Sequence, residues 1–370
     1  MPVVSLLVPI YNAEEYLEEC LESAKAQTLE DIEIICINDG SRDKSKKIIK
    51  KFMDSDARFK LIDKENSGYG ASMNRGLEAA TGKYIGILES DDIMDKNALS
   101  RLVSLADACN ADVAKGDFYR YWSKPKERKE EALNIPYGLV GKMVNIAENP
   151  RIMYKQPSIW SAIYRRGMIK KNNIRFLETP GASYQDTSFD FKVWVCTRRA
   201  VFTKFPVVQY RQDNESSSIN SPEKVYCVCD EYAEMRRFLE EHPEKLEKFS
   251  GVLERMKYNT YLWNYNRLEG DLKLEFLEHM SEELARDQKE GLIERELFED
   301  EIWADLQVLI KSPEEFNAIQ QQFSGDSRGD NIKHYMKVGG PALVGKLFAR
   351  KFKKSKDQKD DDNTGSAFAR

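Results

Sequence analysis

Residues 3–17 read VVSLLVPIYNAEEYL, and they pass from an apolar run to a polar cluster and then to a helical pattern. The apolar run at its start is typical of a strand that is buried on both faces of a sheet. The alternation continues along the chain, which predicts helices at residues 14–27, 41–53 and 72–80 and strands at residues 32–37, 59–62 and 84–88. Strands that alternate with helices pair in parallel through right-handed crossovers. The sequence therefore predicts an α/β fold with a mostly parallel sheet flanked by helices.

Polar clusters close three of the predicted strands: Pro9-Ile10-Tyr11-Asn12, Asn38-Asp39-Gly40-Ser41 and Glu89-Ser90-Asp91-Asp92. Open α/β sheets bind ligands outside the carboxyl ends of their strands, so we expect these clusters to line one crevice. The third cluster is acidic, and carboxylate oxygens are the ligands that Mn²⁺ and Mg²⁺ prefer. A cation in such a crevice usually serves a phosphorylated ligand. The alternative interpretation of this cluster is a solvated helix start.

Four motifs in a fixed order give the chain a resemblance to a known family. Pro9, Tyr11, Asn12, Glu14 and Leu17 form the motif PxYNxExxL. Residues 39–45 then read DGSRDKS, residues 89–92 supply an acidic D-x-D-like motif, and residues 184–189 read YQDTSF. Together the motifs resemble family 2 glycosyltransferases of the GT-A fold, of the type found in bacterial polysaccharide synthesis. The resemblance does not extend to the C-terminal part of the chain.

The resemblance implies an inverting glycosyltransferase that moves a sugar from a nucleotide-diphosphate donor, expected to be UDP-linked, to a glycan or lipid-linked acceptor in surface polysaccharide synthesis. Asp91 is then the ligand of a Mn²⁺ or Mg²⁺ ion that offsets charge on the departing diphosphate. Asp186 is the catalytic base that deprotonates the acceptor hydroxyl. Asp39 is expected to accept a hydrogen bond from the base, and Arg211 to lie near the diphosphate. The expected donor-binding residues are Pro9, Tyr11, Asn12, Glu14, Asp39, Ser67, Gly68, Asn74, Glu89, Ser90, Asp91 and Arg211.

Two positions depart from the pattern of this family. Glu89 stands where an aspartate is typical, and Gln185 stands where a glutamate usually precedes the catalytic aspartate. These departures keep open a second interpretation, a binding or scaffold protein on a catalytically degenerate GT-A fold. A nucleotidyltransferase would share the α/β sheet and the metal. It would, however, place a glycine-rich basic loop after the first strand, where this chain has Pro9-Ile10-Tyr11-Asn12.

Several of the candidates also have purely structural interpretations. Asn12 and Asp186 are residue types that cap helices. The loop at residues 66–70 suits a turn, because its glycines adopt unusual torsions. Trp160 is either part of an acceptor platform or a core aromatic, and Arg211 lies either near a phosphate or on an exposed loop.

The composition narrows the class of protein. The chain has 370 residues and a net charge of −5, so it is long enough for two domains and is no nucleic-acid binder by charge. Its three histidines all fall in the C-terminal part, away from the predicted crevice. Its six cysteines form no CxxC pair, so we expect no zinc site and a reducing, cytoplasmic location. We recognise no secretory signal and no membrane-spanning run.

The predicted organisation is a GT-A domain at residues 1–220, a helical domain at 221–332, a basic amphipathic segment at 333–354 and a disordered tail at 355–370. Within the basic segment, lysines, arginines and apolar residues at helical spacing over 342–354 suit peripheral contact with the inner membrane face. We expect that helix to begin after Pro341, and a terminal helix docked on the protein is the alternative. The donor sugar, the acceptor and the oligomeric state are left open.

Overall fold

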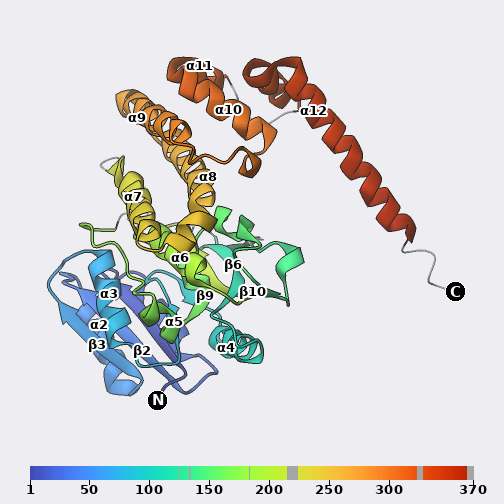
Figure 1. Cartoon of the computed structure of the whole chain (residues 1–370). Helices are drawn as coiled ribbons and strands as arrows, with labels where there is room; N and C mark the ends of the chain where they lie inside the picture. The colour runs from blue at the N-terminus through green and yellow to red at the C-terminus, as the bar shows by residue number, and fades with distance from the viewer. Residues whose placement is uncertain (125, 133–134, 183, 215–223, 323–327, 365–370) are drawn as a thin grey trace. The chain divides into compact units, whose positions relative to one another are not determined.

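The computed structural model describes residues 1–124, 126–132, 135–182, 184–214, 224–322 and 328–364. The chain divides into two compact units, Met1–Leu253 and Glu254–Arg370 (Figure 1). The first unit extends past the domain boundary that the sequence predicts at residue 220. The reason is that helix α7 (Cys227–Glu240) packs against helix α6 (Gln185–Cys196) of the same unit.

A sheet forms the centre of the first unit, with ten strands among the residues that the structure describes. Strands β3, β2, β1 and β4 are neighbours in that order and pair in parallel. Strand β9 is antiparallel to β4 and begins a mixed half with β6, β10 and β5, while β7 pairs with β6 and β8 with β10. The strands are β1 (Val4–Ile10), β2 (Ile32–Asp39), β3 (Phe59–Lys64), β4 (Tyr84–Ile87), β5 (Ile93–Met94), β6 (Val113–Trp122), β7 (Arg128–Ala132), β8 (Met143–Val144), β9 (Ala162–Arg165) and β10 (Ala200–Arg211).

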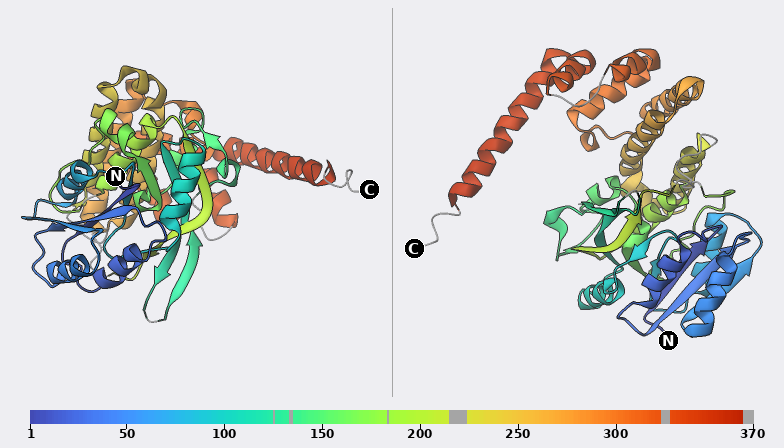
Figure 2. Two further views of the ribbon diagram at one scale, coloured as in Figure 1. Left: turned by 90° about the horizontal axis from the view of Figure 1, so that it is seen from below. Right: turned by 180° about the vertical axis from the view of Figure 1, so that it is seen from behind.

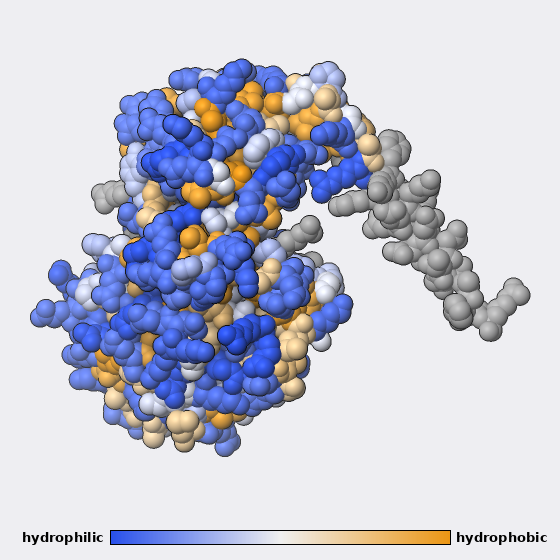
Figure 3. Space-filling model, in the orientation of Figure 1, coloured by the Kyte–Doolittle hydropathy of each residue, from blue (hydrophilic) through white to orange (hydrophobic). Residues whose placement is uncertain are grey.

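The α/β fold class is confirmed. Every residue of β1 and β2 is buried, as expected for parallel strands covered on both faces by helices. Hydrophilic residues cover most of the visible face of this unit (Figure 3). Besides α6 and α7, the unit contains α1 (Leu17–Lys25), α2 (Ser45–Ser55), α3 (Tyr69–Ala79), α4 (Ala98–Ala108), α5 (Arg166–Lys171) and short 3₁₀ helices that include η3 (Ile159–Ser161).

The charged composition of residues 123–131, which include a proline, predicts a loop. The structure differs from this prediction. The structure instead places β7 there, antiparallel to β6, so that the two strands lie side by side (Figure 2). Trp122 and Arg128 are partners in this pairing, and the Arg128 guanidinium lies 3.8 Å from the centre of the Trp122 ring. Strand β7 therefore forms because β6 pairs with it, and the composition of the segment does not reveal this pairing.

Helices make up the second unit, in agreement with the helical pattern predicted there. Helix α8 (Pro243–Arg267) leads from the first unit into the second. It is followed by α9 (Gly270–Lys289), α10 (Asp300–Lys311), α11 (Pro313–Gln321) and α12 (Arg328–Thr364). Among the residues described, none of the helices combines the length and the apolar character needed to span a bilayer.

The C-terminal segment is more helical than the sequence predicts. Helix α12 runs through residues 355–364, where we expect a disordered tail, and residues 365–370 lie outside the described part. A helix also precedes Pro341, so α12 consists of two helices that meet at Gly340, and the second begins at the proline as expected. Gly340 interrupts α12 with a φ of 63°, a conformation that glycine adopts at little cost, and the chain resumes the helix at the proline.

Candidate active site

The loops that follow β1 and β2 are tied to each other by hydrogen bonds. The Asn12 N–H donates to Ser41 Oγ at 3.0 Å, and the Arg42 N–H donates to Asn12 Oδ1 at 2.8 Å. The Lys44 N–H donates to Glu14 Oε2 at 2.9 Å. The first two sequence motifs therefore form one rim of the predicted crevice, and the side chains of Asn12 and Glu14 shape that rim.

This arrangement corrects two expectations about the first motif. Helix α1 begins at Leu17 with Tyr16 as its N-cap, so Asn12 is not a helix cap. Pro9 does not end the strand, because it is paired in register with Ile37 of β2 and the strand continues for one more residue. Tyr11 follows the strand and is 52% exposed, which leaves its ring available to a ligand.

Asp39 ends β2 and orders the loop that follows β3. Its Oδ1 accepts a hydrogen bond from the Ser67 N–H at 2.9 Å, and its Oδ2 accepts one from the Gly68 N–H at 3.0 Å. The Lys64 ammonium also contacts Oδ1. A carboxylate oxygen accepts two hydrogen bonds, so Oδ2 retains one acceptor position. Asp39 is thus both a loop organiser and a candidate contact for a base.

The glycines at the start of α3 allow another segment to pack closely. Gly68 is the N-cap and has a φ of 91°, and a Cβ there would lie 2.7 Å from the Thr179 carbonyl oxygen. A Cβ on Gly70 would lie 2.0 Å from the Leu177 carbonyl oxygen. The loop is therefore a packing contact for residues 177–181 and not simply a turn.

Asn74 holds the same segment through its amide. Its Nδ2 donates to the Phe176 carbonyl oxygen at 3.0 Å and to Glu178 Oε1 at 2.8 Å, and its Oδ1 accepts from the Phe176 N–H at 2.9 Å. Because the side chain is 2% exposed and engaged in these bonds, its expected contact with the donor is not favoured by this geometry. A polar pocket of about 680 Å³ lies beside this contact, lined by Asn66, Ser67, Ala71, Asn74, Arg75, Glu78, Arg175, Glu178, Thr179, Pro180 and Gly181.

The acidic cluster follows β4, and Glu89 is anchored within it. The Tyr69 hydroxyl donates to Glu89 Oε1 at 2.7 Å. Removal from water raises the pKa of Glu89 to about 8, although the bond from Tyr69 opposes this, and the charges of Asp91 and Asp186 raise it further. Carboxyl groups from two separate motifs are therefore close enough to influence one another, as expected if they share one crevice.

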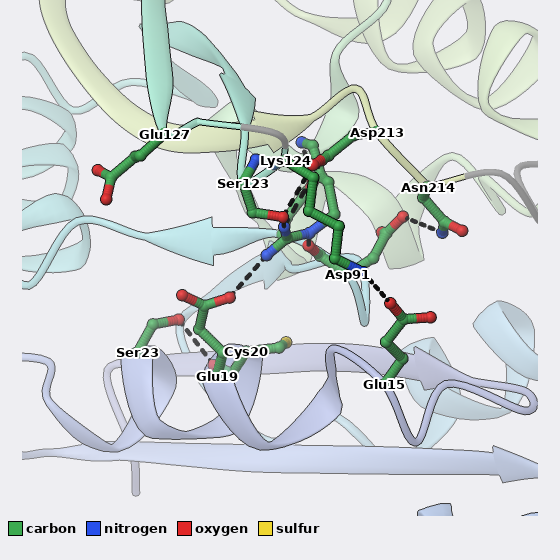
Figure 4. A network of polar contacts seen from close by, with 12 residues as sticks. Glu15, Glu19, Cys20, Ser23, Asp91, Ser123, Lys124, Glu127, Asp213 and Asn214 are labelled. Carbon is green, nitrogen blue, oxygen red and sulfur yellow. Dashed lines mark hydrogen bonds and ion pairs between the residues drawn. The ribbon is translucent and has the colours of Figure 1, made fainter.

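Asp91 is the aspartate of the cluster that solvent can reach. It is partly exposed, as is the neighbouring Ser90, and its Oδ2 accepts a hydrogen bond from Asn214 Nδ2 at 2.7 Å (Figure 4). Asp92 is fully buried, and its Oδ1 accepts a hydrogen bond from the Arg211 N–H at 2.9 Å. Asp91 is thus accessible to solvent, whereas Asp92 is buried and binds the backbone of β10.

Arg211 does not lie on an exposed loop, the second of its predicted locations, because it is buried inside the protein. Its Nε donates to the Asp91 carbonyl oxygen at 2.8 Å, its Nη1 to Ser123 Oγ at 2.9 Å and its Nη2 to Glu19 Oε2 at 2.6 Å. Glu19, Asp91 and Ser123 thus converge on one point (Figure 4). Since the guanidinium is engaged on three sides, we interpret Arg211 as the residue that positions the acidic loop and not as a diphosphate contact.

Asp186 lies in the first turn of α6. Tyr184 is the N-cap of this helix, so Asp186 does not cap it. Removal from water raises the pKa of Asp186 to about 6, against the hydrogen bonds from its own N–H and from Thr187, which lower it. A carboxylate with this pKa is ionised at neutral pH and can still accept a proton.

Gln185 holds the turn before α6 and is 1% exposed. Its Nε2 donates to Thr179 Oγ1 at 2.7 Å and lies 3.2 Å from the Gly181 carbonyl oxygen, which accepts from it. An amide can donate both bonds, whereas an ionised carboxylate only accepts. These two donated bonds give a physical reason for a glutamine at position 185, where the family pattern has a glutamate.

Tyr210 and Trp160 form an aromatic pair beside the carboxylates. Burial raises the pKa of Tyr210, and so do the charges of four carboxylates, those of residues 92, 91, 186 and 89. Trp160 is 7% exposed and stacks on Tyr210 with 4.8 Å between ring centres. Trp160 is therefore a core aromatic behind the site. Tyr210 is not among the site residues predicted from the sequence, although it directly precedes Arg211.

Glu231 is a further carboxyl group near the site that sequence reasoning misses. It belongs to α7, is 1% exposed, and accepts a hydrogen bond from the Ser188 N–H at 3.2 Å. Burial raises its pKa to about 8, the bond from Ser188 opposes this, and the charge of Asp186 adds to it. No motif surrounds it, so no local signal could have indicated it.

Comparisons with known proteins identify the family to which the chain belongs. Residues 5–181 match glycosyl transferase family 2. The putative glycosyltransferase EpsH of Bacillus subtilis is 30% identical over 275 residues, which cover 67% of this chain and 74% of that protein. The crystal structure of S. aureus TarS 1-349 with UDP-GlcNAc has a TM-score of 0.65 at 18% identity, and the match covers 88% of this chain and 93% of that one.

A second solved structure has a related fold. The mannosyltransferase PcManGT from Pyrobaculum calidifontis, in complex with GDP-Man and Mn²⁺, has a TM-score of 0.50 at 14% identity, and the match covers 86% of this chain and 87% of that one. At these identities the two structures show the fold alone, whereas the family match and EpsH show the family. The chain belongs to glycosyl transferase family 2 and is a glycosyltransferase.

Proposed function

We propose that this glycosyltransferase is an inverting, metal-dependent enzyme that transfers a sugar from a UDP-linked donor to a glycan or lipid-linked acceptor. The observation that carries the proposal is that the charges of Asp91 and Asp186, which belong to two distant motifs, both act on Glu89, whose carboxyl group is held by the Tyr69 hydroxyl at 2.7 Å. Such a cluster supplies both a cation ligand and a base in one place.

Asp186 is the proposed base. As the acceptor oxygen attacks the anomeric carbon, the bond from that carbon to the diphosphate oxygen breaks, and its electron pair leaves with the diphosphate. The hydroxyl proton passes to the Asp186 carboxylate. A single displacement of this kind inverts the anomeric centre. The pKa of about 6 suits the role, because the base is then free at neutral pH.

The donor set around Asp91 fits a hard divalent cation. Its groups are carboxylates, and their mutual repulsion would be relieved by a positive charge. Among the residues described, Asp91 belongs to no set of three converging protein ligands, so diphosphate oxygens would complete the shell. When bound, Mn²⁺ or Mg²⁺ supplies positive charge that stabilises the leaving diphosphate.

The remaining donor contacts are proposed from the rim of the crevice. The exposed ring of Tyr11 would lie against the base, and the spare acceptor position on Asp39 Oδ2 would receive its N–H. The TarS structure contains UDP-GlcNAc and the PcManGT structure contains GDP-Man and Mn²⁺, so the fold accepts more than one nucleotide. The choice of UDP rests on Asp39.

Peripheral membrane contact is proposed for residues 342–354, in keeping with a lipid-linked acceptor and a cytoplasmic enzyme of surface polysaccharide synthesis. Leu343 is buried, whereas Phe348 is 46% exposed and Lys346 and Arg350 are exposed. Exposed basic and aromatic side chains on one helix suit an anionic leaflet. The buried leucine shows that part of this helix is also docked on the protein.

The proposal is tested by incubating the protein with a panel of UDP-sugars and GDP-mannose, with Mn²⁺ or EDTA, and measuring the released nucleotide diphosphate. We expect release from one donor only with metal, and loss of release in Asp91→Ala and Asp186→Asn. Asp54→Ala, at an exposed position of α2, is the matched control and should keep full activity. The electron paramagnetic resonance signal of free Mn²⁺ should fall when the protein and UDP are added. This fall should be absent in Asp91→Ala and retained in Asp186→Asn.

The competing interpretation is a degenerate binding protein. It predicts that UDP binds in a calorimeter while no donor is turned over, with or without candidate acceptors such as a bacterial lipid extract. The structure weakens this interpretation, because Glu89 and Gln185 both have satisfied roles in the site. Absence of both UDP binding and donor turnover would overturn the proposed function.

A further inference from the structure

Tyr210 occupies a defined position beside the acidic loop that carries Asp91. It is next to last in β10, and the N–H of the following residue, Arg211, donates to Asp92 Oδ1. Strand β10 also pairs with β5, where Gln209 is the partner of Ile93 directly after the acidic cluster. The backbone on both sides of Tyr210 is therefore fixed against the loop that carries Asp91.

The ring of Tyr210 is held rigidly on one side. Trp160 stacks on it with ring centres 4.8 Å apart and planes at 28°, and Phe118 contacts it edge-on at 6.3 Å. Trp160 and Phe118 are themselves buried and lie 4.7 Å apart. Such a stack leaves the phenol little freedom, so its hydroxyl points in a constant direction.

The phenol is influenced electrostatically by both of the carboxylates proposed to act in the reaction. The charges of Asp91, which would hold the metal, and of Asp186, which would take the proton, both act on it. Tyr210 is partly exposed, and among the residues described no partner donates to its hydroxyl or accepts from it. The hydroxyl is thus a hydrogen-bonding group that the described part of the protein leaves available to a ligand.

What lies between a diphosphate and an acceptor hydroxyl in any glycosyl transfer is the sugar that moves. We propose that the Tyr210 hydroxyl contacts a hydroxyl of the transferred sugar and contributes to the choice of donor. This inference rests on the proposed function, because it takes Asp91 and Asp186 as the two ends of the reaction. It adds a specificity contact from β10, beyond residues 5–181 that match the family.

The test compares Tyr210→Phe with the wild type. Phenylalanine keeps the stack on Trp160 and removes only the hydroxyl. Removing one neutral hydrogen bond should lower kcat/KM for transfer from the preferred UDP-sugar by about 3- to 10-fold. It should also shrink the ratio of kcat/KM between the preferred donor and its epimer, such as UDP-glucose and UDP-galactose, because the discriminating contact is lost. Binding of UDP itself, measured by calorimetry, should not change.

Tyr119→Phe is the matched control. Tyr119 lies on β6, pairs in register with Gln209 and is partly exposed, so the same atom is removed one strand away. The inference is overturned if Tyr210→Phe leaves the ratio between epimers unchanged, or if it weakens UDP as much as the UDP-sugar. A wild type that neither binds UDP nor turns over any donor would instead overturn the proposed function on which the inference rests.

Discussion

The Tyr69 hydroxyl donates a 2.7 Å hydrogen bond to Oε1 of Glu89, which joins the start of α3 to the acidic loop after β4. Glutamate is one methylene longer than the aspartate that is typical here. The longer side chain gives a physical reason for the departure, because it reaches the Tyr69 hydroxyl.

Glu89→Asp should therefore destabilise the protein, because the Tyr69 hydroxyl loses its partner inside the site. The cost of an unsatisfied buried hydroxyl is about 1–3 kcal/mol. The free energy of unfolding in urea measures it, in a double-mutant cycle with Tyr69→Phe. Once Tyr69 is phenylalanine, the aspartate substitution should cost much less. Equal costs in both backgrounds would show that the bond does not stabilise the fold.

The activity should depend on pH through Asp186. Its pKa of about 6 lies above the usual value for aspartate, and the base acts only when it is ionised. The turnover number should thus be constant above pH 7 and fall by about tenfold per unit below pH 6. A pH profile of kcat at saturating Mn²⁺ measures this. A profile that is flat down to pH 5 would contradict the role of Asp186 as base.

The stability should change with pH in the opposite sense. The folded protein holds the Asp186 proton up to about pH 6, whereas the unfolded chain releases it near pH 4. The folded state therefore binds more protons in this window, and its stability decreases as the pH rises through it. Asp186→Asn has no carboxyl proton to release, so its free energy of unfolding should not decrease in this way. The free energy of unfolding of Asp186→Asn minus that of the wild type should therefore increase between pH 4 and pH 6.

Arg211→Met should unfold part of the site, because it removes a buried charge on which Glu19, the Asp91 carbonyl and Ser123 converge. The Asp91 carbonyl oxygen and the Ser123 hydroxyl then lose this partner, at a cost of about 1–3 kcal/mol for each group left unsatisfied, whereas Glu19 is half-exposed and regains water. The free energy of unfolding in urea and the affinity for Mn²⁺ should both decrease. Arg120→Met, on the exposed face of β6, should change neither. Loss of UDP affinity without loss of stability would point to a diphosphate contact instead.

Gln185→Glu restores the residue typical of the family, yet it should be harmful here. The new carboxylate would face the Gly181 carbonyl oxygen, and two acceptors repel each other. We expect a loss of about 1–3 kcal/mol in unfolding free energy and a lower kcat. Thr179→Val, which removes the other acceptor, separates the two contacts. A more stable or more active Gln185→Glu would show that the turn adapts.

Sequence alone determined the layered architecture and the order of the motifs. Apolar runs such as β1, in which all residues are buried, are long enough for their burial to be read from the pattern. Asp91 and Asp186 were also proposed from the sequence, because short motifs surround them. Local patterns suffice where neighbours in the chain carry the signal.

Only the tertiary structure decided which polar groups are engaged and which are free. Arg211 and Asn74 were expected to contact the donor, but partners from distant elements bury and occupy them. Tyr210 and Glu231 carry no motif, and they reach the site because β10 and α7 pack beside it. The physical reason is that hydrogen bonds and desolvation depend on contacts between residues far apart in the chain, which no local pattern records.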